Sequence, residues 1–404
     1  MASPDLTPLE DALGYVLQQA QPINESETVA LTDALDRILA EHQRVPADVP
    51  PADNSSVDGY ALRRCDLASD SALPVSARIP AGTAPTPLQA GTAARIFTGS
   101  EVPDGADSVV MQEQVDITDT GIRVRTDVTQ GQNIRRRGQD LAAGDLALPA
   151  GTRLRAQELG LLASMGVAEV AVKRKLKVAI LTTGDELVEP GLPLGPGQIY
   201  NTNRFTLLGL LQHAACEVTL CEGLADDRAA TEATLASAAA RADLIITTGG
   251  VSVGEEDHVR AALEATGKLA LWRLAIKPGK PLAFGQIDGT PLLGLPGNPA
   301  AVLVTFAMIV MPFIRQCQGQ PRIHPIGERL PAGFEVPSPS IRRGFFRARK
   351  ELDAGQVSLA VHPNQSSGML SSACWADGLA VIPENREVRV GDVLTYYSFS
   401  ELLA

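Results

Sequence analysis

A glycine-rich stretch, "DLIITTGGVSVGEEDHV" at residues 243–259, combines residue types that could do chemistry. An apolar run ends in paired glycines, and Gly250, Ser252 and Gly254 then spell G-x-S-x-G. Between a strand and a helix this spacing can present a nucleophilic serine, as in serine hydrolases. The same loop can instead let backbone N–H groups approach an anion, with the acids at 255–257 placed to hold a metal ion.

These alternatives make different demands on the rest of the chain. A serine hydrolase needs an acid and then a histidine later in the sequence, and the available His324 and His362 stand in proline-rich, strand-like surroundings. Labelling of Ser252 by a fluorophosphonate would support that alternative. The anion site needs only the backbone of the paired glycines and the positive end of a helix that begins near residue 255. A glycine-rich connection that binds nothing is the third alternative.

Acids recur where predicted strands end. Asp185 and Glu186 follow "KVAILTTG", Asp226 and Asp227 follow "EVTLCEGLA", and the acids at 255–257 follow the third strand. Each group taken alone is typical of the first turn of a helix. The carboxyl ends of parallel strands meet at one edge of a sheet, so together these acids would line one crevice. Crowded carboxylates favour a hard cation, and Mg²⁺ typically takes one or two carboxylates together with phosphate oxygens.

Two basic clusters complement the acids. The segment "WRLAIKPGKP" supplies Arg273, Lys277 and Lys280, and "IRRGFFRARK" at 341–350 adds further arginines and a lysine. Runs of this kind are usually solvated faces of strands. In a chain of net charge -12 they also predict a local site for an oxyanion. Each charge-assisted hydrogen bond there would contribute about 1.5–3 kcal/mol.

Composition and motifs exclude several classes of protein. The net charge of -12 argues against a nucleic-acid partner or an anionic membrane partner. No G-x-x-x-x-G-K-[ST] occurs, because Gly279 and Lys280 are followed by Pro281, and no G-x-G-x-x-G follows a strand. The 5 cysteines have no metal-like spacing, and the first residues lack a signal-peptide pattern. We therefore expect a cytoplasmic protein without a membrane or nucleic-acid partner.

The hydrophobic periodicity divides the chain into four units. Helices are expected over 8–20, with a capping box of Thr7 and Glu10, and over 33–42. Strands alternating with helices after residue 176 predict a parallel sheet covered on both faces. The fold class is thus multidomain α/β plus β. The units are a helical and extended linking region (1–45 and 146–175), a β-rich inserted domain (46–145), a three-layer α/β domain (176–325) and a C-terminal β-barrel-like domain (326–404).

Seven blocks of the sequence together resemble one family. The chain is similar, over nearly its whole length and in the same order, to the molybdopterin molybdenumtransferase family, which includes bacterial MoeA and the E domain of gephyrin. No single block is specific, but seven in order are. The blocks are "NSSVDGYA" (54–61), "RIFTGSEVPDGADSVVMQEQ" (95–114), "RRRGQDLAAGD" (135–145), "LTTGDEL" (181–187), "TTGGVSVGEEDHV" (247–259), "IKPGKP" (276–281) and "LPGNPAA" (295–301).

The resemblance implies an activity and its partners. Members of the family insert molybdate into adenylylated molybdopterin with Mg²⁺ and release AMP. They form elongated homodimers, and their α/β domain is related to the adenylyltransferase that acts one step earlier. The substrates expected for this chain are therefore adenylylated molybdopterin and molybdate, and no side-chain nucleophile is required. The adenylyltransferase and molybdoenzyme maturation proteins are further candidate partners.

The resemblance also assigns roles to residues of this chain. The inserted domain supplies positions expected to face the partner subunit's crevice, namely Asp58, Thr98 and Asp140. Positions expected to contact Mg²⁺ and the pterin nucleotide are Glu186, Asp226 and Asp257, with Glu186 and Asp257 as the metal ligands. Substrate-binding positions are Gly249, Gly250, Ser252, Arg273, Lys277, Lys280, Pro296 and Pro299. The C-terminal domain contributes Arg347 and Ser367, expected at molybdate.

Two departures from the family pattern and two other functions stay open. Ala301 stands where the family usually has serine, and Gln139 replaces a usual acid beside Asp140. The first alternative is a non-catalytic scaffold, because the E domain of gephyrin also anchors receptor peptides. The second is an adenylyltransferase that uses the α/β domain alone. The acids argue against the former, and the additional domains argue against the latter.

Overall fold

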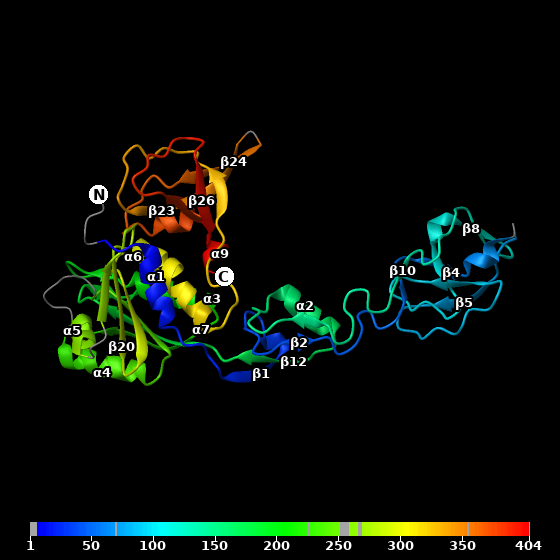
Figure 1. Ribbon diagram of the computed structural model, residues 1–404, viewed down its shortest axis with the longest axis horizontal. Helices are drawn as coiled ribbons and strands as arrows, with labels where there is room; N and C mark the ends of the chain where they lie inside the picture. Colours follow the sequence, from blue (N-terminus) through cyan, green and yellow to red (C-terminus); the bar gives the residue numbers. More distant parts are fainter. Residues whose placement is uncertain are drawn as a thin grey trace.

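The computed structural model describes residues 6–68, 71–224, 227–250, 258–265, 269–353 and 355–403. The chain is elongated (Figure 1). The α/β and C-terminal parts form one end, the β-rich inserted domain forms the other, and the linking region lies between them (Figure 1). The predicted mixed α/β architecture with several sheets is confirmed. The four domain limits stay a prediction.

A six-stranded sheet forms the α/β domain, in the order β16-β13-β17-β21-β20-β18. The first four strands run parallel, as predicted. Strand β20 runs antiparallel to its neighbours, because a tight turn at Asp288 and Gly289, both at positive φ, joins it directly to β21. The strands are β13 (Lys177–Thr183), β16 (Glu217–Leu224), β17 (Leu244–Thr248), β18 (Leu269–Arg273), β20 (Pro281–Ile287) and β21 (Thr290–Leu295).

Helices cover both faces of this sheet. Val178 and Ile180 of β13 point into one apolar core, while Ala179 and Leu181 point into the other. Because both faces are buried, the strand is an uninterrupted apolar run. The predicted three layers are therefore present. The covering helices are α3 (Thr202–His213), α4 (Arg228–Ala239), α5 (His258–Ala265), α6 (Pro299–Thr305), the π-helical turn η4 (Phe306–Val310) and α7 (Met311–Cys317).

One continuous helix, Pro299–Cys317, is long and apolar enough to cross a membrane. Its most apolar window is 94% buried inside the fold. Phe306, Ile309 and Phe313 pack in the larger core of the α/β domain. The apolar character of this helix is thus explained by its burial between the sheet, helix α1 and the C-terminal part.

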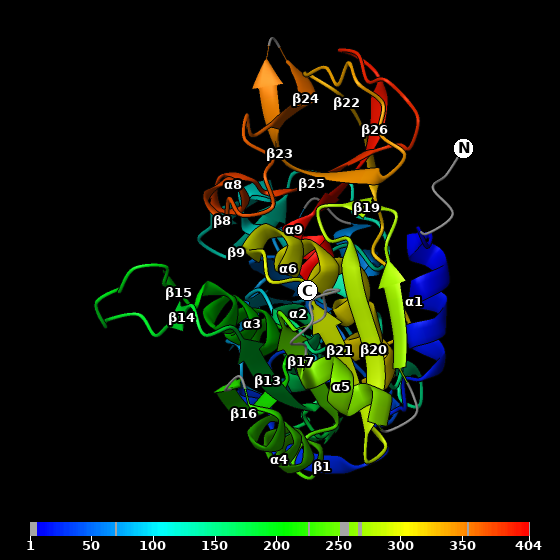
Figure 2. The same ribbon diagram turned by 90° about the vertical axis from the view of Figure 1, so that its left-hand side faces the viewer.

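The first helix, α1 (Leu9–Gln18), confirms the helix predicted over 8–20. The predicted capping box is wrong, because the N-cap is Pro8 and no side chain caps the helix. The Thr7 backbone instead bonds to Arg273 and Ala275, and Glu10 forms an ion pair with Arg343. The Thr7 backbone and the Glu10 side chain therefore form tertiary contacts instead of a capping box. Figure 2 shows α1 running along the side of the α/β sheet.

The linking region has its own core beneath α2 (Ala156–Ser164). Strands β1 (Ser26–Ala30) and β12 (Glu169–Lys173) pair antiparallel. The helix predicted over 33–42 is wrong: a 3-10 turn covers Leu31–Asp33, a second turn follows with Asp36 at positive φ, and Ile38 and Leu39 then form β-bridges. Burial decides this, because Leu39 is fully enclosed against Val172 across the bridge. The short strand β2 (Gln43–Arg44) pairs with β11 (Leu146–Leu148).

The inserted domain is built on a four-stranded sheet in the order β5-β6-β4-β7. Gly59 in β4 allows close strand approach, because a Cβ there would lie 1.9 Å from the carbonyl oxygen of Val110. The β-rich character predicted for this region is confirmed. Its elements are β3 (Asn54–Ser55), β4 (Gly59–Leu62), η2 (Arg64–Ala68), β5 (Val75–Ile79), β6 (Ala93–Ile96), β7 (Ser108–Met111), η3 (Gln112–Gln114), β8 (Val115–Thr118), β9 (Gly121–Val124) and β10 (Ile134–Arg135).

The C-terminal part is a curled sheet in the order β19-β23-β25-β26-β22, with β24 paired to β23 (Figure 2). The strand pairing among the described residues does not close this sheet into a barrel. The prediction of a barrel-like domain is therefore confirmed only in that the sheet is curled. The hairpin predicted around Asp353 and Gly355 is confirmed. The elements are β19 (Ile276–Lys277), β22 (Glu328–Pro331), β23 (Arg343–Asp353), β24 (Gln356–Val361), α8 (Ser371–Trp375), β25 (Gly378–Ile382), β26 (Val393–Ser398) and α9 (Phe399–Leu403).

Candidate functional site

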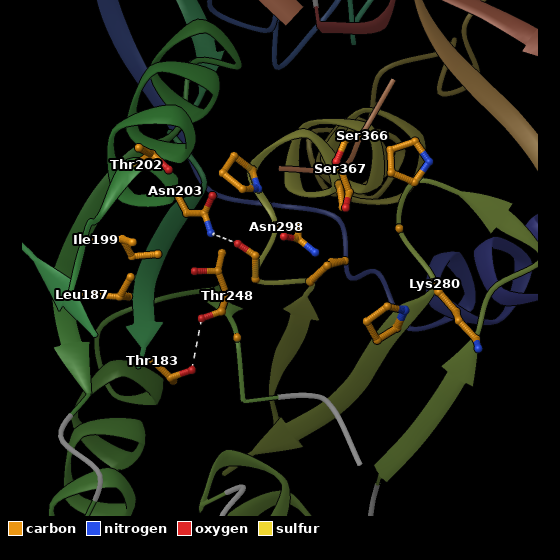
Figure 3. Close-up of a pocket in the computed structure, with 18 of the residues that line it drawn as sticks. Thr183, Leu187, Ile199, Thr202, Asn203, Thr248, Lys280, Asn298, Ser366 and Ser367 are labelled. Carbon is orange, nitrogen blue, oxygen red and sulfur yellow. Dashed lines mark hydrogen bonds between the residues drawn. The ribbon is translucent and has the colours of Figure 1, made fainter. Parts of the chain in front are cut away.

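A crevice of about 700 Å³ lies at the carboxyl edge of the α/β sheet, between it and the C-terminal part. The chain leaves β13 toward β16 on one side and leaves β17 toward β18 on the other. Adjacent parallel strands whose connections depart in opposite directions form the switch point at which open α/β sheets bind ligands. Thr183 and Thr248 end these two strands, and the Thr183 hydroxyl donates to the Thr248 carbonyl at 3.3 Å (Figure 3).

Many of the predicted site residues line this crevice. They come from five separate segments of the chain, which only the fold brings together. Their placement agrees with the prediction, whereas their individual roles stay predictions. The predicted residues in the lining are Glu186, Gly249, Lys277, Lys280, Pro296, Pro299 and Ser367.

The paired glycines are required by the close approach of β13 and β17. Gly249 has φ +80°, and a Cβ there would lie 2.5 Å from the Thr183 hydroxyl and 2.9 Å from its carbonyl oxygen. Gly250 also has positive φ and is not part of the lining; a Cβ there would lie 3.1 Å from the Thr183 hydroxyl and 3.4 Å from a Val259 methyl. The glycines therefore set the shape of the strand exit, with Gly249 at the surface of the crevice.

Gly249→Ala is expected to destabilise the fold more than Gly289→Ala. Both glycines have positive φ, which costs an alanine about 1–2 kcal/mol. Gly289 faces open space, whereas the new methyl at Gly249 meets Thr183. Thermal unfolding of the two variants measures the difference. Equal losses would show that the approach to Thr183 is not restrictive.

Three cations form what we call the cationic wall of the crevice, Lys277, Lys280 and Arg342. Strand β19 places Ile276 opposite Arg343, which brings Arg342 beside residues 277–280, which we call the lysine loop. The guanidinium of Arg342 reaches the carbonyl of Ile276 at 3.5 Å. Among the described residues none of these three side chains forms an ion pair. Their charges are therefore available to an anion.

Arg347 is fully buried and lies behind the lining, not in it. Its Nε donates to the Ser372 hydroxyl at 2.9 Å and one terminal nitrogen donates to the Ser366 carbonyl at 3.0 Å. The other terminal nitrogen has no partner within the described part of the chain. Burial lowers the pKa of Arg347 to about 10. This cation therefore supports the segment that carries Ser367.

The remaining predicted basic residue, Arg273, does not line the crevice. It ends strand β18 at the sheet edge, opposite Pro281, and its carbonyl accepts from Thr7. The antiparallel pairing of β18 with β20 brings the backbone after Arg273 beside Lys280, whose carbonyl accepts from the N–H of Leu274 at 2.6 Å, but Arg273 itself is not part of the lining. Of the three basic residues that this segment was predicted to supply for substrate binding, the crevice lining contains Lys277 and Lys280.

Several lining residues were not predicted from the sequence. Asn203 follows the N-cap residue Asn201 of α3, and its amide nitrogen donates to the Gly297 carbonyl at 2.7 Å (Figure 3). Asn298 and Ser366 also face the crevice. The sequence carries one signal for them, because asparagine is a common N-cap residue, but capping accounts only for Asn201.

Asp58 and Thr98 lie together in the inserted domain. Asp58 accepts hydrogen bonds of 2.8 Å from both the backbone N–H and the hydroxyl of Thr98. These two bonds, with a smaller contribution from Arg95, lower the pKa of Asp58. Asp140 is exposed in the segment beside Val49. Asp58 directly precedes β4 and Thr98 follows β6, so both belong to the inserted domain, which occupies the end of the molecule opposite the crevice (Figure 1).

Three predicted residues, Asp226, Ser252 and Asp257, lie outside the described residues. Asp227 accepts from the backbone N–H of Ala230 at 2.8 Å and so caps α4. Its carboxylate therefore has a structural role. Within the described ranges no group of three His, Cys, Asp or Glu side chains could hold a metal ion.

The fold and the crevice define a class first: a multidomain α/β protein with a crevice lined by cations at the switch point of a parallel sheet. Three family models then match in order. They are MoeA N-terminal region (domain I and II) over residues 7–166, probable molybdopterin binding domain over 179–316 and MoeA C-terminal region (domain IV) over 329–399.

Relatives support the same assignment along the whole chain. The molybdopterin molybdenumtransferase of Haemophilus influenzae is 40% identical over 407 residues, covering 98% of this chain and 99% of the relative. The protein of that name from Nostoc sp. is 38% identical, covering 89% and 85%. The crystal structure of the molybdopterin biosynthesis moeA protein from Pyrococcus horikoshii OT3 superposes with a TM-score of 0.81 at 30% identity, covering 97% and 100%. The chain belongs to the molybdopterin molybdenumtransferase family, enzymes of molybdenum cofactor biosynthesis.

Proposed function

We propose that this enzyme inserts molybdate into adenylylated molybdopterin, with Mg²⁺, and releases AMP. The observation that carries the proposal is the distribution of charge in the crevice. Glu186 follows β13 and the two lysines precede β20, and β17 and β21 lie between these two strands in the sheet. A phosphoanhydride needs both a metal ligand and cations, so this distribution suits a nucleotide-linked substrate better than an uncharged one.

The described residues fit one Mg²⁺ ion held by a single carboxylate. Glu186 is exposed in the crevice, and Gly184 leaves room for it, since a Cβ there would lie 2.4 Å from a Glu186 carboxylate oxygen. Mg²⁺ commonly takes one or two carboxylates and completes its shell with phosphate oxygens and water. When bound, it would neutralise charge on the phosphoanhydride. Asp257 is the proposed second ligand.

The cationic wall and the Ser367 segment would divide the two anions between them. Lys277, Lys280 and Arg342 would bind the phosphate oxygens and stabilise the AMP that leaves. Ser367 would contact molybdate, with the buried charge of Arg347 behind it. Holding both anions in one crevice replaces an encounter in solution by a reaction between bound groups. Ala301 lies in the same lining, so the hydroxyl usual in the family is not needed to form the crevice.

The inserted domain would complete the site in a homodimer. Asp58 and Thr98 form one unit, yet within one chain they are at the end of the molecule away from the crevice (Figure 1). An arm of this length can reach the crevice of a second copy of the chain, and a two-fold dimer would form two such shared sites. We propose that Asp140 also contributes to the shared site.

The proposal also covers the cellular location of the enzyme and its partner proteins. All 5 cysteines are free, in agreement with a reducing, cytoplasmic environment. The adenylyltransferase of the preceding step and the proteins that mature molybdoenzymes are proposed partners. An adenylyltransferase activity of this chain is the alternative, and ATP-dependent adenylylation of molybdopterin would reveal it. A non-catalytic scaffold would show neither reaction.

The direct test is release of AMP from adenylylated molybdopterin by the purified protein. We expect release to require both molybdate and Mg²⁺. Molybdate supplies the inserted group, and Mg²⁺ would neutralise negative charge on the phosphoanhydride. Chromatographic quantification of AMP, with chelator and molybdate-free controls, measures it. Release at the same rate without molybdate would contradict the proposal.

A further inference from the structure

Asp58 and Thr98 lie just beyond the paired part of strands β4 and β6. The outermost pair between these two strands is Gly59 with Ile96, and Asp58 stands directly before Gly59 in the chain. Positions outside a strand ladder open more readily than its centre, because fewer hydrogen bonds hold them. The direction of the Asp58 carboxylate therefore depends on contacts other than the pairing of β4 with β6.

The guanidinium of Arg95 joins the two strand ends. One of its terminal nitrogens donates to the Gly59 carbonyl at 2.8 Å and to the Ile96 carbonyl at 3.3 Å. The other terminal nitrogen donates to the side-chain oxygen of Gln112 at 2.5 Å. The backbone N–H of Gln112 in turn donates to the Asp58 carbonyl at 3.1 Å. One side chain thus connects the residue after Asp58, the end of β6 and the segment that holds the Asp58 backbone.

Two aromatic rings hold this guanidinium in place. Its central carbon lies 4.6 Å from the ring centroid of Phe97 and 5.2 Å from that of Tyr60. Arginine combines such stacking with donors arranged in a planar fork, whereas the lysine ammonium is a point charge on a flexible stem. Lysine in place of Arg95 would therefore keep the positive charge but lose the planar set of bonds that joins the strand ends.

We propose that Arg95 is a positioning residue for the reaction, which holds the ends of β4 and β6 so that the Asp58 carboxylate points into the crevice of a second copy of the chain. This inference rests on the proposed function, because it takes the shared site as given. Arg95 itself need not touch the substrate. Its effect passes through Asp58, so it should disappear once Asp58 has lost its charge.

The test is a double-mutant cycle on the full-length protein, with molybdate-dependent AMP release measured for the unaltered protein, Arg95→Lys, Asp58→Asn and the two changes together. Arg95→Lys is expected to lower release about tenfold, because displacing a group at the site by about 1 Å can cost up to about 100-fold in rate. In the Asp58→Asn background the same change should alter the remaining release by less than about twofold. A merely structural role would lower release by the same factor in both backgrounds.

The choice of lysine isolates geometry from charge. The pKa of Asp58 is lowered mainly by its two bonds from Thr98, and the charge of Arg95 is the smallest of the causes. Arg78→Lys is the matched control, because Arg78 lies opposite Arg95 on the neighbouring strand β5 and contacts the same Phe97 ring at 4.8 Å. We expect this control to retain parental release.

A second variant keeps the test valid if Arg95→Lys fails to fold, which thermal unfolding would show. Gln112→Met removes the oxygen that accepts from Arg95 at an exposed position, while its backbone bond to the Asp58 carbonyl remains. It should lower release about threefold, the effect of one lost hydrogen bond, and it should have no further effect in the Asp58→Asn background.

Three results would overturn the role of Arg95: parental release in a folded Arg95→Lys variant, an equal loss in both backgrounds, or an equal loss in Arg78→Lys. The other variants separate these results from failure of the proposed function. If Asp58→Asn is impaired and Arg95→Lys is not, only the role of Arg95 is wrong. If Asp58→Asn keeps parental release, the shared site and the positioning role are both wrong, and absence of release by the unaltered protein contradicts the proposed function itself.

Discussion

Replacing Lys277 and Lys280 together by alanine is expected to lower molybdate-dependent AMP release by roughly 10²–10⁴-fold, since each charge-assisted hydrogen bond contributes about 1.5–3 kcal/mol. Both lysines line the crevice, and neither forms an ion pair within the described residues. Their removal leaves Arg342 as the one cation of the cationic wall. Steady-state AMP release, with saturating substrate where attainable, measures the effect.

A matched control is Lys350→Ala. Lys350 lies on β23 and is paired with Glu328 at 2.6 Å, away from the crevice lining. Loss of such an exposed pair costs at most about 1 kcal/mol of stability and should leave turnover unchanged. Because the lysine loop packs on α6 through Gly279, thermal unfolding must show that the double variant retains its fold. If the folded double variant keeps turnover within tenfold of the unaltered protein, the cationic wall does not bind the phosphates.

Asp58→Asn is expected to lower AMP release about ten- to hundredfold, and mixing it with the Lys277→Ala, Lys280→Ala variant should restore activity. Asparagine can still accept from Thr98, so the inserted domain keeps its local structure while it loses a charge. In a shared site each mixed dimer has one intact crevice, formed by the unaltered halves of the two chains. Random exchange of subunits would then restore about a quarter of parental activity.

Recovery on mixing discriminates sharply between two architectures. If Asp58 acted on the crevice of its own chain through a large bend of the arm, every mixed dimer would contain two defective sites. The mixture would then show only the average of its components. Molar mass by light scattering provides the accompanying measurement, because a monomer at assay concentration excludes a shared site irrespective of activity.

The sequence predicted the elements of the α/β domain well because their signals are local. Continuous apolar strands such as 177–183 and the helix at 202–213, with its Asn201 cap, follow from hydrophobic patterning and capping alone. The helix predicted over 33–42 was wrong because that prediction, too, relied on local signals alone. A short apolar run is compatible with either a helix or a strand, and contacts with residues more than a hundred positions away selected the extended form.

The residues of the candidate site also fall into two groups, those that local motifs predicted and those that only the tertiary structure brings to the crevice. The strand exits with Glu186 and Gly249, the lysine loop and the Pro296 turn could be found from motifs, since each is a short segment with its own spacing. Arg342 could not be separated from its basic neighbours, because only the pairing of β19 with β23 brings it to the crevice. Arg347 was expected at the anion, but its burial behind the Ser366 carbonyl places it one layer further back.

What the sequence determined by itself was therefore the family, the order of the elements and most of the residues that meet at the sheet edge, because periodicity, turn residues and short motifs are properties of neighbouring positions. The tertiary structure alone decided which of the charged residues share a surface, which polar atoms are left without partners, and that Asp58 and Thr98 lie at the far end from their own crevice. Those are relations between segments distant in the chain. They depend on strand pairing and packing, which bring together residues that no local pattern connects.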